Sequence, residues 1–201
     1  MKMKKIYFMR HSEPLKYNNL ENNDSLQVQN EKWVLSINGE EIARKKSLIK
    51  ELSDFDMVIS SNYVRAIATA KYFARNKINV IKAFGERKFG INAWSELPDD
   101  FGAKQFNDFN YKNSSCESLN EVADRELKAL YQVLDTYQDK KILIVGHSTA
   151  LMALFSKWCD LCCDGYKFRG NEFFDGHWNY CETFKLTFDD DNKLIDIENI
   201  K

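Results

Sequence analysis

Two short apolar runs in this sequence lead directly into a histidine. Residues 6–9 are followed by Arg10 and His11. Residues 142–145 are followed, one glycine later, by His147. A short apolar run is typical of a buried strand in a parallel sheet, and such sheets bind ligands where their strands end. Because arginine offers a planar fork of donors to phosphate or carboxylate, and histidine is a nucleophile or proton carrier near neutral pH, we expect an anion-processing site there.

A cation and a carboxylate follow two further expected strands. Arg65 falls in the first turn of a helix that begins just after Asn62, and Glu86 follows the apolar run 78–84. A cation in the first helical turn opposes the helix dipole, and a bound anion removes the conflict because helix N-termini bind phosphate. We therefore expect Arg65 to bind an anion. Asn62 either caps this helix or contacts the same anion.

The set of two arginines, two histidines and one carboxylate suits phosphoryl transfer. An arginine can bind two phosphate oxygens at once, and its charge neutralises the negative charge that develops during the reaction. A histidine nitrogen can attack phosphorus and hold the phosphoryl group covalently. A carboxylic acid can protonate the leaving oxygen. Glu86 is the favoured proton donor, with Glu96, Asp99 and Asp100 as nearby alternatives.

The spacing of apolar residues predicts an α/β fold, a three-layer α/β/α sandwich. Its sheet is mostly parallel, with an antiparallel edge made by a C-terminal hairpin. The expected strands are residues 4–9, 57–59, 78–84, 142–145, 183–188 and 194–200. Helices are expected after Ser36 or Asn38, after Asn62, after Ser118 and over 149–158. Residues 160–180 are expected to be loop-like.

We expect residues 1–201 to form a single domain with two caps over the strand ends. The cap segments are about 13–34, which is polar and without clear period, and 88–116, which is irregular and rich in aromatic residues. The aromatic residues of 89–111 are expected to form a small core within their cap, in preference to a platform for substrate.

The composition is that of an ordinary globular protein. Lys plus Arg is 29 and Asp plus Glu is 30, a net charge of −1, which argues against a general nucleic-acid binder. No apolar run approaches the length of a membrane span, and the run at residues 6–9 is too short for a signal peptide. These features predict a cytoplasmic protein without a nucleic-acid or membrane partner. They leave its oligomeric state open.

The cysteines allow two interpretations. The chain has five, and Cys159, Cys162 and Cys163 lie close together, with His177 and Cys181 downstream. They are either a zinc site or reduced structural thiols. One Cys-x-x-Cys pair without a second is weak support for zinc, so the thiols are favoured.

Several segments, in order, resemble motifs of the histidine phosphatase superfamily, also called the phosphoglycerate mutase-like family. Phe8-Met9-Arg10-His11-Ser12 is similar to its Arg-His-Gly signature, and Val145-Gly146-His147-Ser148 to its second-histidine motif. Other matching segments are the helix entry Leu35-Ser36 to Gly39 with Ala43, the run 60–66 with Thr69 and Ala70, Gly85-Glu86-Arg87 to Gly90, and Cys116-Glu117-Ser118.

The resemblance implies a role for each matching residue. His11 would be the nucleophile that becomes phosphohistidine. Arg10, Arg65 and His147 would hold the phosphoryl group. Glu86 would donate a proton and then activate water. The family needs no metal and no organic cofactor, and its substrates are phosphorylated.

Three positions depart from the family pattern. Ser12 stands where the family has glycine, and its hydroxyl could add a contact to phosphate. Asn92-Ala93-Trp94 stands in place of Trp-Glu-Gly, and Cys116 replaces a glycine. These departures concern the identity of the substrate more than the phosphate chemistry.

A phosphatase acting on a small phosphate monoester through a phosphohistidine is the favoured function. The alternatives are phosphoglycerate mutase-type transfer and a non-catalytic phosphate-binding or interaction module. Mutases of the family carry longer caps and tails, whereas the last expected strand ends beside Lys201. A binding module would usually lose the nucleophile or an arginine, and this sequence keeps both.

Overall fold

A six-stranded sheet forms the middle of the molecule in the computed structural model, which describes residues 3–17, 24–113, 115–162 and 165–201. The strand order is β11-β10-β1-β6-β4-β5. Neighbours among β1, β6, β4 and β5 are parallel, whereas β10 pairs antiparallel with both β1 and β11. The bounds are β1 Lys4–Arg10, β4 Met57–Ser60, β5 Asn79–Val80, β6 Ile142–Gly146, β10 Thr183–Phe188 and β11 Leu194–Ile200. The mostly parallel sheet and its antiparallel C-terminal hairpin are confirmed.

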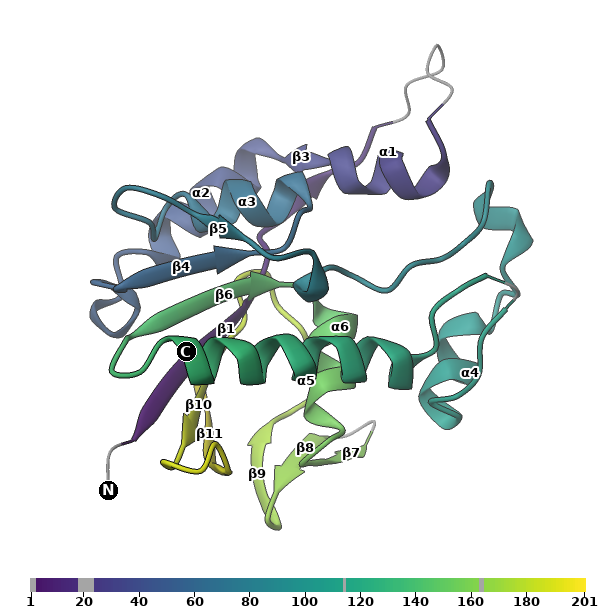
Figure 1. Ribbon diagram of the computed structural model, residues 1–201. Helices are drawn as coiled ribbons and strands as arrows, with labels where there is room; N and C mark the ends of the chain where they lie inside the picture. The colour runs from purple at the N-terminus through teal and green to yellow at the C-terminus, as the bar shows by residue number, and fades with distance from the viewer. Residues whose placement is uncertain (1–2, 18–23, 114, 163–164) are drawn as a thin grey trace.

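Helices cover both faces of this sheet, as predicted for a three-layer sandwich (Figure 1). The elements α5 and α6 pack on one face, and α2 and α3 on the other, while α1 and α4 project beyond the ends of β4 and β6. The α-helices are α1 Leu26–Lys32, α2 Ile37–Lys46, α3 Val64–Ala70, α4 Phe101–Asn107, α5 Leu119–Thr136 and α6 Ser148–Phe155. Short 3₁₀ turns occupy Lys50–Leu52, Lys82–Phe84 and Trp94–Glu96.

The two faces of β1 bury separate parts of the core. Ile6 and Phe8 point to the side of α5 and α6, and Tyr7 and Met9 to the side of α2 and α3. All four are 2% exposed or less. A strand buried on both faces reads as a continuous apolar run, which is why the sequence pattern identified β1 and β6.

Helix starts follow the predicted capping residues. Ser36 caps α2 by accepting a hydrogen bond from the Gly39 amide, and Ser118 caps α5 in a capping box with Glu121. Each cap satisfies amide groups that the first helical turn leaves without a partner.

Residues 160–180 are not loop-like, and that prediction is wrong. They contain a second, antiparallel sheet of β7 (Asp160–Cys162), β8 (Gly165–Phe168) and β9 (Asn171–Phe174). Strands of three or four residues are too short for alternation to be read. Tyr166 and Phe174 of this sheet join the core beside α5 and α6, so burial against that core decides the structure.

Two other predicted elements are shorter than expected. Only Asn79–Val80 of the run 78–84 pairs as a strand, and the chain then turns so that Phe84 packs edge-on against Phe8 at 6.0 Å. The helix after Asn62 ends at Ala70, although apolar spacing continues to Phe73. In both places the turn buries the last aromatic residue of the run, since Phe84 is 0% and Phe73 is 7% exposed.

The two predicted cap segments both contain structure. In the first, β2 (Pro14–Leu15) pairs with β3 (Val34–Leu35) and α1 lies between them, while residues 18–23 lie outside the described residues. In the second, Ile91, Phe101 and Cys116 form a small core, as predicted. Leu26 of α1 packs against that core, so the caps touch each other.

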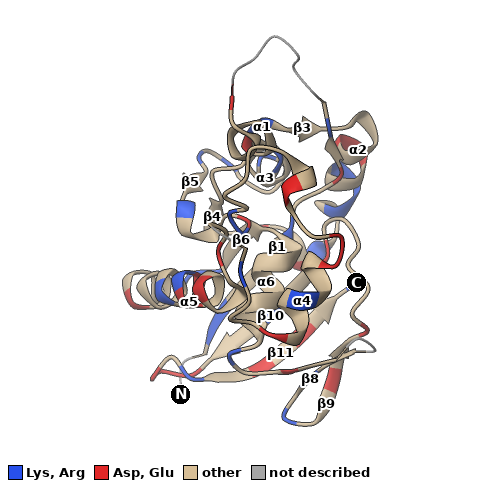
Figure 2. Cartoon of the chain, turned by 90° about the vertical axis from the view of Figure 1, so that its right-hand side faces the viewer, with Lys and Arg blue, Asp and Glu red and all other residues tan. Residues whose placement is uncertain are grey.

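Basic and acidic residues are interspersed along the chain, as the colours of Figure 2 show. Along α5, for example, both signs occur within the same helix. In the ranges that the structure describes, no helix combines the length and apolarity needed to cross a membrane.

Candidate active site

The paired ends of β1 and β6 bring the two predicted histidines together. Arg10 pairs with Gly146 in the sheet register, and the His11 amide donates to the Gly146 carbonyl at 2.9 Å. The rings of His11 and His147 consequently lie with centroids 5.0 Å apart. The expectation that these residues meet at one sheet edge is confirmed.

The hydrogen bonds of His11 define which ring nitrogen carries a lone pair. Nδ1 lies 2.6 Å from the Ser12 carbonyl oxygen, which can only accept, so Nδ1 carries the proton in the neutral ring. Nε2 accepts from Arg65 Nε at 3.0 Å. Nε2 is therefore the unprotonated nitrogen, and its lone pair accepts the hydrogen bond from Arg65.

His11 is neutral at physiological pH. Burial, followed by the positive charge of Arg65, lowers its pKa well below the usual range of histidine. A neutral imidazole keeps its lone pair, and this is the form in which histidine acts as a nucleophile.

Arg65 lies at the centre of the group. Its guanidinium donates to His11, to the Asn30 carbonyl at 2.6 Å, and over a longer 3.4 Å contact to Nδ1 of His147. The ring of Tyr63 lies 4.6 Å from its central carbon. Its hydrogen-bond partners in the described part of the chain are all neutral, so a buried positive charge stands there without a directly bonded anion. Burial lowers the pKa of Arg65, and an anionic ligand would offset that cost.

Arg10 approaches from the opposite side of the sheet end. It donates to the Trp178 carbonyl at 2.7 Å and lies over the Tyr180 ring at 4.7 Å. Its Nε is buried and has no hydrogen-bond partner among the described residues. That donor, together with Arg65, could bind a phosphoryl oxygen.

His147 is fully buried at the start of α6. Its Nε2 lies 2.9 Å from the Ser61 hydroxyl, and the Tyr63 ring packs edge-on at 4.5 Å. Burial, followed by the charge of Arg65, lowers its pKa well below the usual range. In the neutral ring, a Nδ1 that accepts from Arg65 leaves the proton on Nε2, directed to Ser61.

Ser12 and Asn62 lie near this group with their donors already bonded. The Ser12 hydroxyl donates to the Gly39 carbonyl at 2.7 Å, and its amide donates to Thr69 Oγ1 at 2.9 Å. The Asn62 amide donates to Glu31 at 3.1 Å. These bonds attach the loops of the site to α2, α3 and α1. Phosphate contact by either residue stays a prediction.

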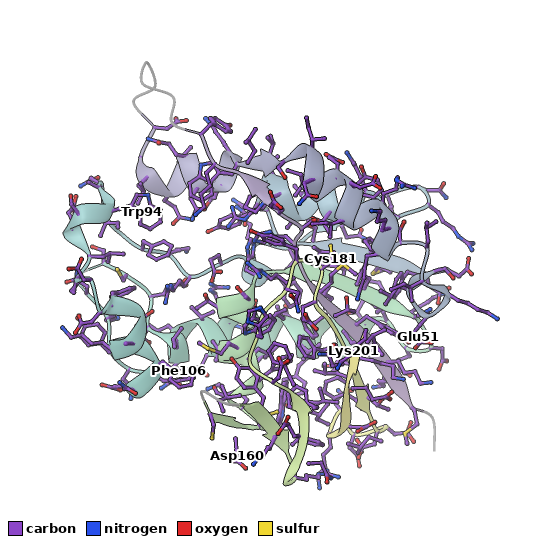
Figure 3. The ribbon with its side chains drawn as sticks, turned by 180° about the vertical axis from the view of Figure 1, so that it is seen from behind. Glu51, Trp94, Phe106, Asp160, Cys181 and Lys201 are labelled. Atoms are coloured by element: carbon purple, nitrogen blue, oxygen red, sulfur yellow. The ribbon has the colours of Figure 1, made fainter. Side chains whose placement is uncertain are left out.

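Glu86 lies beside the cations on the wall of an open cavity. This cavity has a volume of about 630 Å³ and is lined by Lys16, Tyr17, Asn30, Trp33, Arg65, Glu86, Phe89 and Trp94. Glu86 is the only carboxylate among these lining residues. Of the alternative acids, Glu96 accepts from the Asn92 and Ala93 amides and Asp100 pairs with Lys104. Figure 3 shows Trp94 at the end of the molecule away from the labelled Glu51 and Lys201.

Sequence reasoning gave too little weight to the residues that hold the group in place. Ser61 was included only within the matching run 60–66, but its hydroxyl lies against His147. Thr69, noted only as part of a matching motif, joins the Ser12 amide to the Arg65 carbonyl. The Asn30 carbonyl was not foreseen, because a backbone group carries no signal in the sequence.

The cysteines do not gather into one group, because Cys181 interacts with Ser12 at the site whereas Cys159 packs against the core beside α5 and α6. Cys163 is outside the described residues, and Cys159, Cys162 and Cys181 are free thiols. No group of three or more histidine, cysteine or acidic residues close enough to hold a metal occurs in the part of the chain that is described. Burial raises the pKa of Cys159 to about 12 and that of Cys181 to about 11.

The comparison with protein families agrees with this site and fold. The model of the histidine phosphatase superfamily (branch 1) matches residues 6–200, and the chain belongs to that superfamily. A curated relative is the uncharacterized phosphatase PhoE of Bacillus subtilis, 32% identical over 127 residues. That match covers 61% of this chain and 63% of the relative, less than two thirds of its length.

Solved structures share the fold at low sequence identity. A mycobacterial glucosyl-3-phosphoglycerate phosphatase is 15% identical with a TM-score of 0.71, covering 98% of this chain and 97% of its own. A mutant phosphoserine phosphatase from Entamoeba histolytica, in complex with phosphoserine, is 18% identical with a TM-score of 0.67, covering 96% of both chains. These similarities are similarities of fold.

Proposed function

We propose that this protein is a phosphatase that hydrolyses a small phosphate monoester through a phosphohistidine on His11. The observation that carries the proposal is the state and position of His11. Its ring is neutral and held in one tautomer, and its unprotonated Nε2 lies 3.0 Å from Nε of the buried Arg65 guanidinium. A nucleophile and a phosphate-binding cation are thereby held side by side.

The first step transfers the phosphoryl group to the protein. Arg65 exchanges its hydrogen bonds to the two histidines for bonds to the phosphoryl oxygens, which Arg10 also binds. His147 joins them in the tautomer whose Nε2 accepts from the Ser61 hydroxyl and whose Nδ1–H donates to phosphate. Nε2 of His11, released from Arg65, attacks phosphorus. The N–P bond forms as the ester P–O bond breaks, and protonated Glu86 gives its proton to the leaving alcohol oxygen. The N–H groups of the arginines stabilise the transition state most, because negative charge develops there on the phosphoryl oxygens.

The second step returns the protein to its starting form. Glu86, now a carboxylate, takes a proton from a water molecule as that water attacks phosphorus. The N–P bond breaks, inorganic phosphate leaves, and the lone pair returns to Nε2. Each of these steps uses side chains of this chain alone.

Ser12 and Asn62 have a supporting part in this proposal. The hydrogen bonds of Ser12 to Gly39 and Thr69 would keep the His11 loop in place, so the serine serves where the family has glycine. We further propose that residues 1–201 act as one domain, whose segments 13–34 and 88–116 surround the bound substrate.

Hydrolysis is favoured over mutase-type transfer because the cavity is accessible to water. Trp94 is 45% exposed and Tyr17 is 44% exposed on its wall. A mutase must keep water from the phosphorylated histidine through two transfers. The relatives named above as phosphatases of phosphoserine and of glucosyl-3-phosphoglycerate also support a small phosphorylated substrate.

The test is hydrolysis of para-nitrophenyl phosphate by the wild type, His11→Ala and His177→Ala, each with and without EDTA. His177 is an exposed histidine outside the site and is the matched control. We expect activity that resists EDTA, falls at least about a thousandfold in His11→Ala, and persists in His177→Ala.

Mass spectrometry of wild type that is mixed with substrate, denatured in alkali and kept at alkaline pH should find a phosphoryl group on His11, because the N–P bond of phosphohistidine breaks in acid. Unchanged activity in His11→Ala would contradict the proposal. Phosphate binding without any turnover would instead favour the non-catalytic module.

A further inference from the structure

The cavity beside Arg65 is much larger than a phosphate group, and half of its lining residues are aromatic. Its volume of about 630 Å³ lies in the range of pockets that enclose whole small molecules. Four of its eight lining residues are aromatic: Tyr17, Trp33, Phe89 and Trp94. The space must therefore receive the alcohol part of the substrate, and its walls present flat apolar rings.

The two tryptophans stand on opposite caps. Trp33 follows α1, and its ring lies 5.8 Å from the central carbon of Arg65 and 5.6 Å from the ammonium of Lys16. Trp94 belongs to the second cap and packs edge-on against Phe89 at 5.0 Å. The expectation that the aromatic residues of this cap form a core holds for Phe101, which is 4% exposed, but not for Trp94, which is 45% exposed. Leaving a large ring in water costs free energy that a ligand could recover.

A buried amide on the cavity wall also lacks a partner. Asn30 is 4% exposed and lines the cavity, yet its side-chain Oδ1 has no hydrogen-bond partner among the described residues. Buried polar groups are nearly always paired, so an unpaired amide beside a cavity indicates a ligand with polar edge atoms. The unpaired atom is an amide oxygen, which accepts hydrogen bonds, and the edge of a nucleobase carries N–H donors for such an acceptor.

We propose that the substrate is a phosphate monoester of the nucleoside 5′-monophosphate type, with its base against Trp33 and Trp94 and within reach of the Asn30 amide. This inference rests on the proposed phosphatase function, because it assigns the other end of the same substrate. A base is flat, stacks on aromatic side chains and carries polar edge atoms, so it matches all three features of the cavity. An alkyl phosphate such as phosphoglycerate would leave both rings without a flat partner.

The test compares adenosine 5′-monophosphate with ribose 5-phosphate. Both are primary phosphate esters of the same sugar, so they differ in the base and hardly in leaving-group chemistry. We expect kcat/KM to be at least about tenfold higher for the nucleotide. Trp94→Ala and Trp33→Ala should each remove about tenfold of the nucleotide value and change the ribose 5-phosphate value less than about twofold. Tyr137→Ala, which removes a 37% exposed ring at the far end of α5, is the matched control.

Binding is measured separately by calorimetry on His11→Ala, which cannot turn the ligand over. We expect adenosine 5′-monophosphate to bind at least about tenfold more tightly than ribose 5-phosphate. Equal kcat/KM and equal affinity for the two compounds, with para-nitrophenyl phosphate still hydrolysed, would overturn the inference and leave the proposed function intact. Base-dependent binding without hydrolysis of any ester would overturn the proposed function and support the ligand class.

Discussion

At the scale of single residues, the backbone decides what His11 can do. The Ser12 carbonyl binds Nδ1 and Arg65 donates to Nε2, so one tautomer satisfies both contacts. The catalytic nitrogen is thereby chosen before any substrate arrives.

The pKa shifts predict that the site histidines stay neutral in mild acid. An ordinary histidine is half protonated near pH 6.5. Burial, followed by the charge of Arg65, lowers the pKa of His11 and His147, so protonation moves to lower pH. We expect NMR signals of both rings, assigned with His11→Ala and His147→Ala, to titrate below the ordinary histidine value of about 6.5. Titration of either ring near pH 6.5 would contradict the buried, arginine-flanked site.

Glu86→Gln should separate substrates by their leaving groups. The amide cannot donate a proton as an acid does, and proton transfer matters most for poor leaving groups. We expect kcat/KM to fall about a hundredfold or more for alkyl phosphates and less than about tenfold for para-nitrophenyl phosphate. Equal losses for both classes would show that Glu86 is not the proton donor. Glu96→Gln is the matched control, because Glu96 lies in the nearby cap segment 88–116 and its carboxylate accepts from the Asn92 and Ala93 amides.

At the scale of elements, the first turn of α2 lies directly against the loop that carries His11. A Cβ added to Gly39 would lie 2.2 Å from the Glu13 carbonyl oxygen. The Gly39 carbonyl also accepts from the Ser12 hydroxyl. The close approach of two backbones therefore requires glycine at this position.

Gly39→Ala should accordingly damage both stability and activity. We expect a loss of about 1–3 kcal/mol in the free energy of unfolding, because the clash is with backbone and neither segment can move freely. We also expect kcat/KM to fall at least about tenfold as the His11 loop shifts. Gly102→Ala is the matched control, since a Cβ there meets nothing within 4 Å. Equal behaviour of the two variants, in thermal melts and in kinetics, would contradict this account.

At the scale of the whole molecule, one acidic side chain lies inside the core without supporting hydrogen bonds. Glu126 of α5 is 1% exposed, and neither carboxylate oxygen has a hydrogen-bond partner among the described residues. Burial raises its pKa well above the usual range. The folded protein therefore keeps a proton that the unfolded chain releases above its ordinary pKa of 4.5.

The proton on Glu126 predicts that the free energy of unfolding depends on pH. As pH rises above 4.5, the unfolded chain releases this proton and the folded protein does not, which favours the unfolded chain. The free energy of unfolding therefore falls by up to about 1.4 kcal/mol for each pH unit, until the pKa of Glu126 in the folded protein is reached. Glu126→Leu removes this effect. We therefore expect the variant to have a higher free energy of unfolding than wild type at pH 7, and the difference between the two proteins to be smaller at pH 5. Denaturant unfolding at the two pH values measures it. A variant less stable than wild type at both pH values would indicate that Glu126 has a structural partner.

The sequence by itself determined the elements and residues whose signal is local. The apolar runs of β1 and β6, the caps Ser36 and Ser118, and the ordered motifs around His11, Arg65 and His147 are all contained in a few adjacent residues. Local patterns of this kind follow from burial on both faces of a strand and from the amide groups at a helix start.

Only the tertiary structure decided features that depend on distant segments. The sheet of β7 to β9 forms because Tyr166 and Phe174 are buried against α5 and α6. The tautomer of His11 depends on Arg65, which lies 54 positions along the chain. The cavity that joins Trp33 to Trp94 exists because both caps fold over one sheet edge. Such contacts depend on where the chain returns in space, and no pattern of neighbouring residues records that.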